Sequence, residues 1–145
     1  MAAISRADVV WEGDLIHGKG RVKVASGTFG EFPVTWGTRA ERDKGGTSPE
    51  ELIAAAHAAC YSMALSNGLA KAGHEPERLT TTAEVEFVPG KGIISSTITV
   101  RGHIHGLSAG DFEKFAEEAK EGCPVSQALK GNVELKLEAE LDHVH

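Results

Sequence analysis

Two cysteines, Cys60 and Cys123, are the residues of this chain best suited to covalent chemistry. Cys60 lies within the apolar segment SPEELIAAAHAACYSMALSNGLAKAG, residues 48–73. A free cysteine often behaves as a small buried hydrophobe, so both packing and chemistry remain open for it. Chemistry requires the thiolate, because the thiolate rather than the thiol is the nucleophile.

Local rules favour Cys123 over Cys60 as the ionised thiol. In GCPVSQAL, Cys123 precedes Pro124 and is predicted to be the N-cap of a short helix, where a thiolate is stabilised. Cys60 lies about three turns into its helix, beyond the reach of the helix dipole. Burial in apolar surroundings would raise the pKa of Cys60 and keep it inert.

Cys60 therefore needs a cation nearby if it is to react. His57 precedes it by three residues and shares its helical face. The preceding loop TRAERDKGGT, residues 38–47, offers Arg39 and Arg42 as alternatives. A histidine on an apolar helix is also commonly a hydrogen-bonded core residue, so His57 keeps both interpretations.

The start of the helix gives a structural duty to some of its polar residues. Ser48 fits the N-cap, Pro49 the first helical position, and Glu51 the capping-box partner three residues after the cap. Glu50 has no such duty beyond a favourable interaction with the helix dipole. It is either a solvated acid of the first turn or a functional residue.

The pattern along the chain predicts an α+β fold. Short strands separated by glycine-rich turns are expected over residues 7–37, and alternation predicts further strands over 79–87, 93–106 and 133–141. Helices are expected at 48–73, 108–121 and 122–131. Strands in runs indicate largely antiparallel sheets, packed around the long helix. That helix is apolar on all sides, which predicts burial within a sheet core or an oligomer.

Length, composition and charge narrow the class of protein. The chain has 145 residues and a formal net charge of −6, so we expect one domain over 1–145 with no basic surface for nucleic acid. We expect neither a membrane span nor a signal peptide. Two cysteines without a secretory signal favour a reducing cytoplasm and a catalytic or metal-binding pair.

Two separated motifs, SPEELIAAAHAACYSMAL and CPVSQALKGNVELKLEAEL, closely resemble the OsmC/Ohr family of thiol-dependent peroxidases. The resemblance extends through WEGDLIHGKG and TRAERDKGGTSPEEL and covers nearly the whole chain. His57 before Cys60, with an arginine in the preceding loop, is more similar to the OsmC branch. The resemblance implies an intertwined homodimer with an OsmC-like fold that reduces organic hydroperoxides and hydrogen peroxide.

The resemblance also implies roles for individual residues, and it reverses the local preference for Cys123. Cys60 would be the peroxidatic thiol and Cys123 the resolving one, with Arg39 and Glu50 completing the site and His57 in a supporting role. No bound metal or flavin is implied. The reductant would be an external dithiol such as dihydrolipoamide or a lipoylated protein.

Helix geometry adds a constraint on Glu50 and Cys60. They are ten residues apart, which is ~15 Å along one helix axis and does not return to the same face. If both serve one site, we expect Glu50 to come from a second chain, in a dimer with composite sites.

Two other classes of function remain as alternatives. A zinc-binding module could use Cys60, His57 and Cys123 with His103 and His105, although the spacing matches no standard zinc signature. A non-enzymatic domain for apolar ligands would keep the fold and use both cysteines as packing. The terminal HVH is interpreted as a solvated tail.

Overall fold

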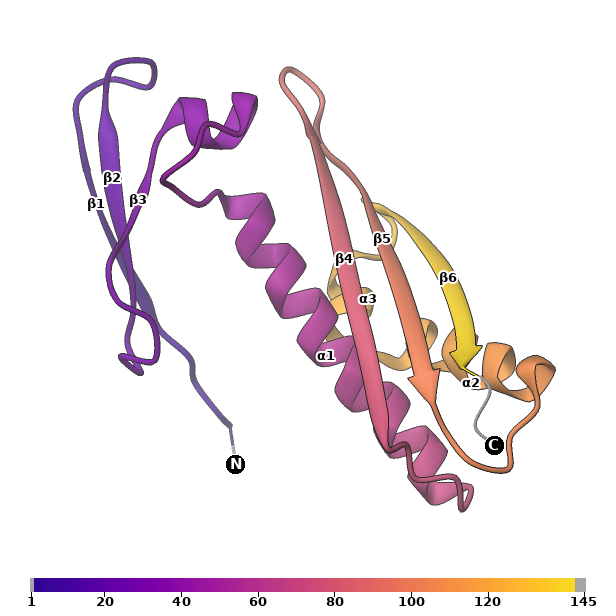
Figure 1. Ribbon diagram of the computed structural model, residues 1–145. Coiled ribbons are helices and arrows are strands. Elements are labelled where there is room, and N and C mark those ends of the chain that lie inside the picture. Colours follow the sequence, from indigo (N-terminus) through magenta and orange to yellow (C-terminus); the bar gives the residue numbers. More distant parts are fainter. Residues whose placement is uncertain (1, 143–145) are drawn as a thin grey trace. The chain divides into compact units, whose positions relative to one another are not determined.

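The computed structural model describes residues 2–142 of the chain (Figure 1). The residues group into two compact units, 1–52 and 53–145, and each unit is described by itself. The terminal HVH, interpreted above as a solvated tail, lies outside the described residues.

The first unit contains a three-stranded antiparallel sheet. Its strands are β1 (Ala7–Glu12), β2 (Lys19–Val24) and β3 (Phe32–Val34), in the order β1-β2-β3. Gly20 lies opposite both Trp11 and Val34, and a Cβ at this position would lie 2.7 Å from the Trp11 ring. Glycine therefore lets the indole pack directly on the sheet. Every residue of β1 is exposed in the single chain.

The loop that follows is more ordered than its composition predicts. We expected no regular structure over residues 38–47, but Gly37–Glu41 form a single π-helical turn, η1. Reciprocal bonds between two threonines secure its start: Thr35 N–H donates to Thr38 Oγ1 at 2.9 Å, and Thr38 N–H donates to Thr35 Oγ1 at 3.1 Å. Arg42 ends the turn in the left-handed region, at φ 55°, and its guanidinium donates to the Thr38 carbonyl.

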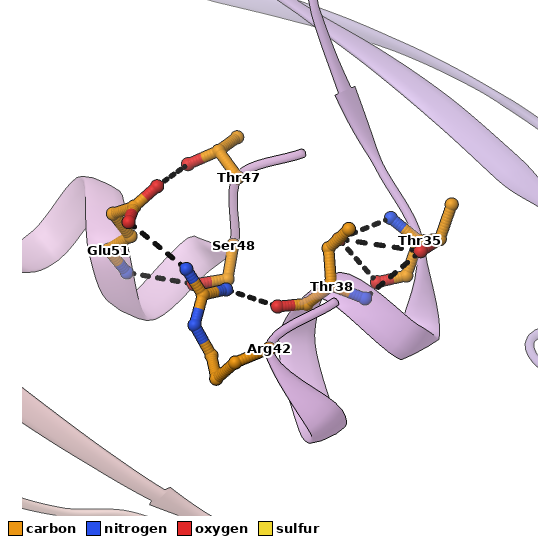
Figure 2. A network of polar contacts seen from close by, with 6 residues as sticks. All are labelled: Thr35, Thr38, Arg42, Thr47, Ser48 and Glu51. Atoms are coloured by element: carbon orange, nitrogen blue, oxygen red, sulfur yellow. Dashed lines mark hydrogen bonds and ion pairs between the residues drawn. The ribbon is translucent and has the colours of Figure 1, made fainter. Parts of the chain in front are cut away.

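The long helix α1 (Pro49–Lys71) begins as predicted at a serine cap. Ser48 Oγ accepts from Glu51 N–H at 3.0 Å, one half of the expected capping box. The Glu51 carboxylate accepts instead from Thr47 Oγ1 at 2.8 Å and from Arg42 at 3.0 Å (Figure 2). Glu51 therefore ties the loop to the first turn of α1.

The second unit pairs three strands with two helices. The strands β4 (Arg78–Val88), β5 (Gly92–His103) and β6 (Glu134–Asp142) form a sheet in that order, and α2 (Ala109–Gly122) and α3 (Pro124–Leu129) lie between β5 and β6 in sequence. The β4–β5 pair is antiparallel, but β5–β6 is parallel. Three of the four strand pairs described are antiparallel, so the expectation of largely antiparallel sheets is confirmed, with β5–β6 as the exception. A helical crossover returns the chain to the same end of the sheet, so the next strand runs parallel.

The core of the second unit lies between the sheet, α1 and α2. Tyr61, Leu65 and Leu69 form a buried stripe on α1, one helical turn apart, and pack with Phe112 of α2. Gly102 of β5 lets the Phe112 ring approach, because a Cβ there would lie 2.7 Å from a ring carbon.

In the single chain α1 is buried along one side only, so its burial on all sides stays a prediction that concerns an oligomer. Ala55, Ala56, Ala59 and Met63 are exposed, and Met63 is 73% exposed. Periodicity could not separate these residues from the buried stripe, because both sides of the helix are equally apolar. Among the described residues, no helix is long and apolar enough to span a membrane.

Candidate active site

Arg39 and Glu50 form a charged pair in the first unit. Arg39 Nε donates to Glu50 Oε1 at 3.1 Å and to Oε2 at 3.2 Å, and Nη2 donates to Oε2 at 2.9 Å. Glu50 is 5% exposed, so it is not the solvated first-turn acid that its position alone allows. A planar guanidinium held by both carboxylate oxygens has a fixed orientation. Arg42, the other candidate of the loop, pairs with Glu51 at 3.0 Å and is half exposed.

A pocket of about 410 Å³ lies within the first unit, beside Arg39. Its wall is apolar apart from the Arg39 side chain and Thr35. The other lining residues are Ala7, Val9, Trp11, Leu15, Val22, Val34, Trp36, Pro49 and Leu52. A few polar groups in an apolar pocket are typical of sites for small apolar ligands with one polar end.

In the second unit the two cysteines meet, although 62 residues separate them in sequence. Both are free thiols, with Cys123 fully buried and Cys60 partly exposed. Cys123 is the N-cap of α3, as predicted. The Cys123 thiol and the Val125 backbone N–H, in the first turn of α3, both lie close enough to Cys60 to shift the pKa of its thiol.

Burial raises the pKa of the Cys60 thiol. The neighbouring Cys123 thiol raises it further, whereas the hydrogen bond from Val125 N–H lowers it. The net direction is upward, so this environment favours the neutral thiol. The expectation that Cys60 needs a cation therefore holds on physical grounds.

His57 is a buried, hydrogen-bonded residue of the second unit. Its Nδ1 lies 2.7 Å from Ser96 Oγ, and its Nε2 lies 2.8 Å from Ser126 Oγ. Burial lowers the pKa of His57, so the ring is neutral at neutral pH. His57 therefore does not supply the cation considered for Cys60. Since both ring nitrogens are engaged by hydroxyls, neither is directed toward a metal ion.

His103 and His105, the other histidines considered for a zinc site, contact Glu77 in a separate cluster. Glu77 accepts from His103 at 3.2 Å and from His105 at 2.6 Å. His103 is the last residue of β5 and His105 lies in the following turn, so they do not share a strand face. Within residues 2–142, no three His, Cys, Asp or Glu side chains are arranged to hold a metal ion.

The comparisons with known proteins identify the family. The sequence profile described as OsmC-like protein matches residues 42–138. Peroxiredoxin OsmC of Escherichia coli is 44% identical over 128 residues, which cover 86% of this chain and 89% of that protein. The chain belongs to the OsmC family.

Further relatives extend the same result. Organic hydroperoxide resistance protein-like 1 of Staphylococcus saprophyticus is 34% identical over 103 residues, 68% of this chain and 72% of that protein. The crystal structure of an organic hydroperoxide resistance protein OsmC from Legionella pneumophila matches with a TM-score of 0.70 at 27% identity, covering 96% of this chain and 99% of that one. The resemblance stated from the motifs and the α+β OsmC-like fold are thereby confirmed.

The structure thus brings Arg39 to Glu50 in the first unit and Cys60 to Cys123 in the second. Three residues of the candidate site were not singled out from the sequence: Ser96 and Ser126, which hydrogen-bond to His57, and Val125, whose N–H acts on Cys60. Ser126 lies three residues after Cys123, on the same face of a short helix. This spacing alone could have pointed to Ser126 from the sequence. Ser96 and the Val125 N–H carry no such signal, because they reach the site through tertiary packing.

Proposed function

We propose that this chain is a cysteine-based peroxidase that reduces organic hydroperoxides and hydrogen peroxide, with Cys60 as the peroxidatic and Cys123 as the resolving thiol. The observation that carries the proposal is the contact between two free thiols, one partly exposed and one buried, in a member of the OsmC family. The partly exposed thiol is reached first by a substrate, and the buried one is placed to react second.

The reaction needs only the two thiols, the peroxide and an external dithiol. The Cys60 thiolate attacks the distal oxygen of ROOH, the O–O bond breaks, and the alkoxide leaves as ROH after taking a proton. Cys60 is then a sulfenic acid. Cys123 attacks its sulfur, a disulfide forms and water leaves. A dithiol such as dihydrolipoamide, free or on a lipoylated protein, reduces the disulfide by thiol–disulfide exchange.

Arg39 is the cation that we assign to Cys60. A guanidinium stays charged at any working pH, so it offsets the burial that raises the pKa of Cys60. It can also stabilise the charge that develops on the leaving alkoxide. Glu50 fixes its orientation through the hydrogen bonds described above.

We further propose that these sites are completed by a second copy of the chain. Glu50 and Cys60 are ten residues apart on α1, ~15 Å along its axis, so one carboxylate cannot serve the thiol of its own helix. The exposed small residues of α1 allow close approach of another helix. Val10 of β1, which is 61% exposed and does not line the pocket, adds apolar surface suited to a dimer interface.

The substrate class follows from the pocket beside Arg39. Its apolar wall suits a lipid-like or aromatic hydroperoxide, whose polar end would face the guanidinium. Both thiols must be reduced at the start of each turnover, so we place the activity in the reducing cytoplasm.

Thiol titration with dithiobis-nitrobenzoate, before and after one equivalent of cumene hydroperoxide, separates this proposal from its alternatives. Rapid loss of both thiols supports the peroxidase. No loss would instead support a non-enzymatic domain for apolar ligands. Loss only after treatment with a chelator would support a zinc-binding module.

A further inference from the structure

A chain of three buried polar side chains joins α1, β5 and α3 beside the cysteine pair. His57 of α1 is fully buried, and its ring nitrogens lie 2.7 and 2.8 Å from the hydroxyl oxygens of Ser96 and Ser126. Ser96 is also fully buried and Ser126 is 1% exposed. One imidazole therefore links a strand on one side to a short helix on the other.

Such a chain fixes geometry more strongly than apolar contacts of the same size. Hydrogen bonds are directional, whereas apolar contacts tolerate sliding. In the neutral ring one nitrogen donates and the other accepts, so both hydroxyls must be present to satisfy it. Loss of either hydroxyl leaves a buried ring nitrogen unpaired, so the arrangement resists displacement of α3.

His57 and Ser126, which bond to each other, are each three residues away in sequence from one of the two cysteines. His57 precedes Cys60 by three residues on α1, and Ser126 follows Cys123 by three residues on α3. Residues three apart share a helical face. The two helices therefore meet twice, at the His57–Ser126 hydrogen bond and at the thiols, where Val125 N–H also reaches Cys60.

We propose that Ser96, His57 and Ser126 are positioning residues that hold the N-terminal turn of α3 against Cys60, so that Cys123 captures the sulfenic acid before it is oxidised further. This inference rests on the proposed peroxidase function. In the step concerned, the Cys123 sulfur attacks the Cys60 sulfenic sulfur, the S–O bond breaks, an S–S bond forms, and water leaves with the Cys123 proton. Disulfide formation depends strongly on the distance and orientation of the two sulfurs.

Ser126→Ala removes the hydroxyl at the α3 end of the Ser96–His57–Ser126 hydrogen-bond network. Ser126→Thr is the variant that restores a hydroxyl. In a single turnover with cumene hydroperoxide, we expect Ser126→Ala to slow disulfide formation about tenfold to a hundredfold. Attack on the peroxide should slow clearly less than disulfide formation, because Cys60 lies on α1 and only its contact with the Val125 N–H depends on α3. Dimedone trapping of the sulfenic acid separates the two steps. Ser126→Thr should recover most of the rate.

Ser62→Ala is the matched control. Ser62 also lies on α1 and donates to Thr81 at 2.7 Å, but it is not part of the Ser96–His57–Ser126 hydrogen-bond network. We expect both steps to remain at the wild-type rate in this variant. Equal slowing of both steps in Ser126→Ala, or an effect no larger than that of Ser62→Ala, would overturn the inference.

A second measurement separates this inference from the proposed function. In glutathione buffers, the equilibrium between the Cys60–Cys123 dithiol plus oxidised glutathione and the disulfide plus two reduced glutathiones reports the effective concentration of the two thiols without any peroxide. We expect Ser126→Ala to lower it about tenfold and Ser62→Ala to leave it unchanged. An unchanged value in Ser126→Ala contradicts the positioning role, whereas a wild-type protein that loses no thiols to peroxide contradicts the peroxidase.

Discussion

The guanidinium of Arg39 holds both carboxylate oxygens of Glu50 through its Nε and Nη2 groups, with hydrogen bonds of 2.9 to 3.2 Å to a residue that is 5% exposed. A buried carboxylate held in this way gives the arginine one orientation. Arg42, three residues later, instead joins the Thr38 carbonyl to Glu51 at the loop surface. The two arginines of one loop therefore offer a direct comparison between a fixed and an exposed charge.

Replacing Arg39 should affect the chemistry of Cys60 far more than replacing Arg42. We expect Arg39→Ala to raise the pKa of the thiol and to slow its oxidation near neutral pH by about a hundredfold, the usual cost of one lost electrostatic contact in a transition state. The rate of alkylation by iodoacetamide, measured as a function of pH, should then rise with its midpoint at a higher pH than in the wild type. Arg42→Ala is the control, and equal effects of the two variants would mean that the loop acts through its general charge.

Shared sites predict that two inactive variants regain activity together. Cys60→Ser lacks the thiol and Glu50→Ala lacks the orienting carboxylate, so each homodimer should be inactive. Co-refolded hybrids should hold one intact site, with Cys60 from one parent and Glu50 from the other, and recover partial activity. Mixing Cys60→Ser with the Cys60→Ser/Glu50→Ala double variant is the control. Proven hybrids without activity would reduce Glu50 to a helix-end acid.

The buried imidazole of His57 predicts a pH-dependent stability. Because its pKa is lowered on folding, the unfolded chain binds a proton first as pH falls below about 6.5. Stability is therefore fully present above that pH and declines below it, by at most ~1.4 kcal/mol per pH unit. Urea unfolding at pH 7.5 and 5.5 should show this loss. The loss of stability between these two pH values should be smaller in His57→Gln and should persist in His17→Gln, a control at an exposed histidine. An unchanged pH dependence in His57→Gln would contradict the assignment of this loss to His57.

The apolar pocket predicts that substrate size matters at Trp11. Trp11→Ala removes a large part of the pocket wall, so KM for cumene hydroperoxide should rise about tenfold while the rate with hydrogen peroxide stays within about twofold. Phe29→Ala is the matched control, since Phe29 is an exposed aromatic side chain that does not line the pocket. Equal changes with both peroxides would place the substrate elsewhere.

The sequence predicted the secondary structure closely, because the pattern signals were local. Ser48 predicted the start of α1, and alternating apolar residues predicted β4 to β6. Cys123 before Pro124 predicted the N-cap position of α3. The parallel β5–β6 pair escaped prediction, since which strand pairs with which depends on the crossover rather than on any one segment. The exposed side of α1 escaped it because Ala59 and Met63 are as apolar as the buried stripe.

The chemistry of the candidate site was harder to predict from residue types. Local rules favoured Cys123 as the reactive thiol. They were right that burial raises the pKa of Cys60 and that Cys123 occupies the N-cap position of α3, but the Cys123 side chain makes no capping hydrogen bond. They could not place His57, whose two serine partners come from distant segments. Assigning Cys60 the first step depends on the family and on its partial exposure, not on helix position.

A single turnover of Cys60→Ser and Cys123→Ser with one equivalent of cumene hydroperoxide tests the central claim most directly. Peroxide consumption and dimedone trapping by mass spectrometry report which sulfur is oxidised. We expect Cys123→Ser to consume about one equivalent and stop with a sulfenic acid at Cys60, and Cys60→Ser to consume none. The reverse result, with consumption by Cys60→Ser and none by Cys123→Ser, would contradict the account and make the helix-capping thiol the nucleophile.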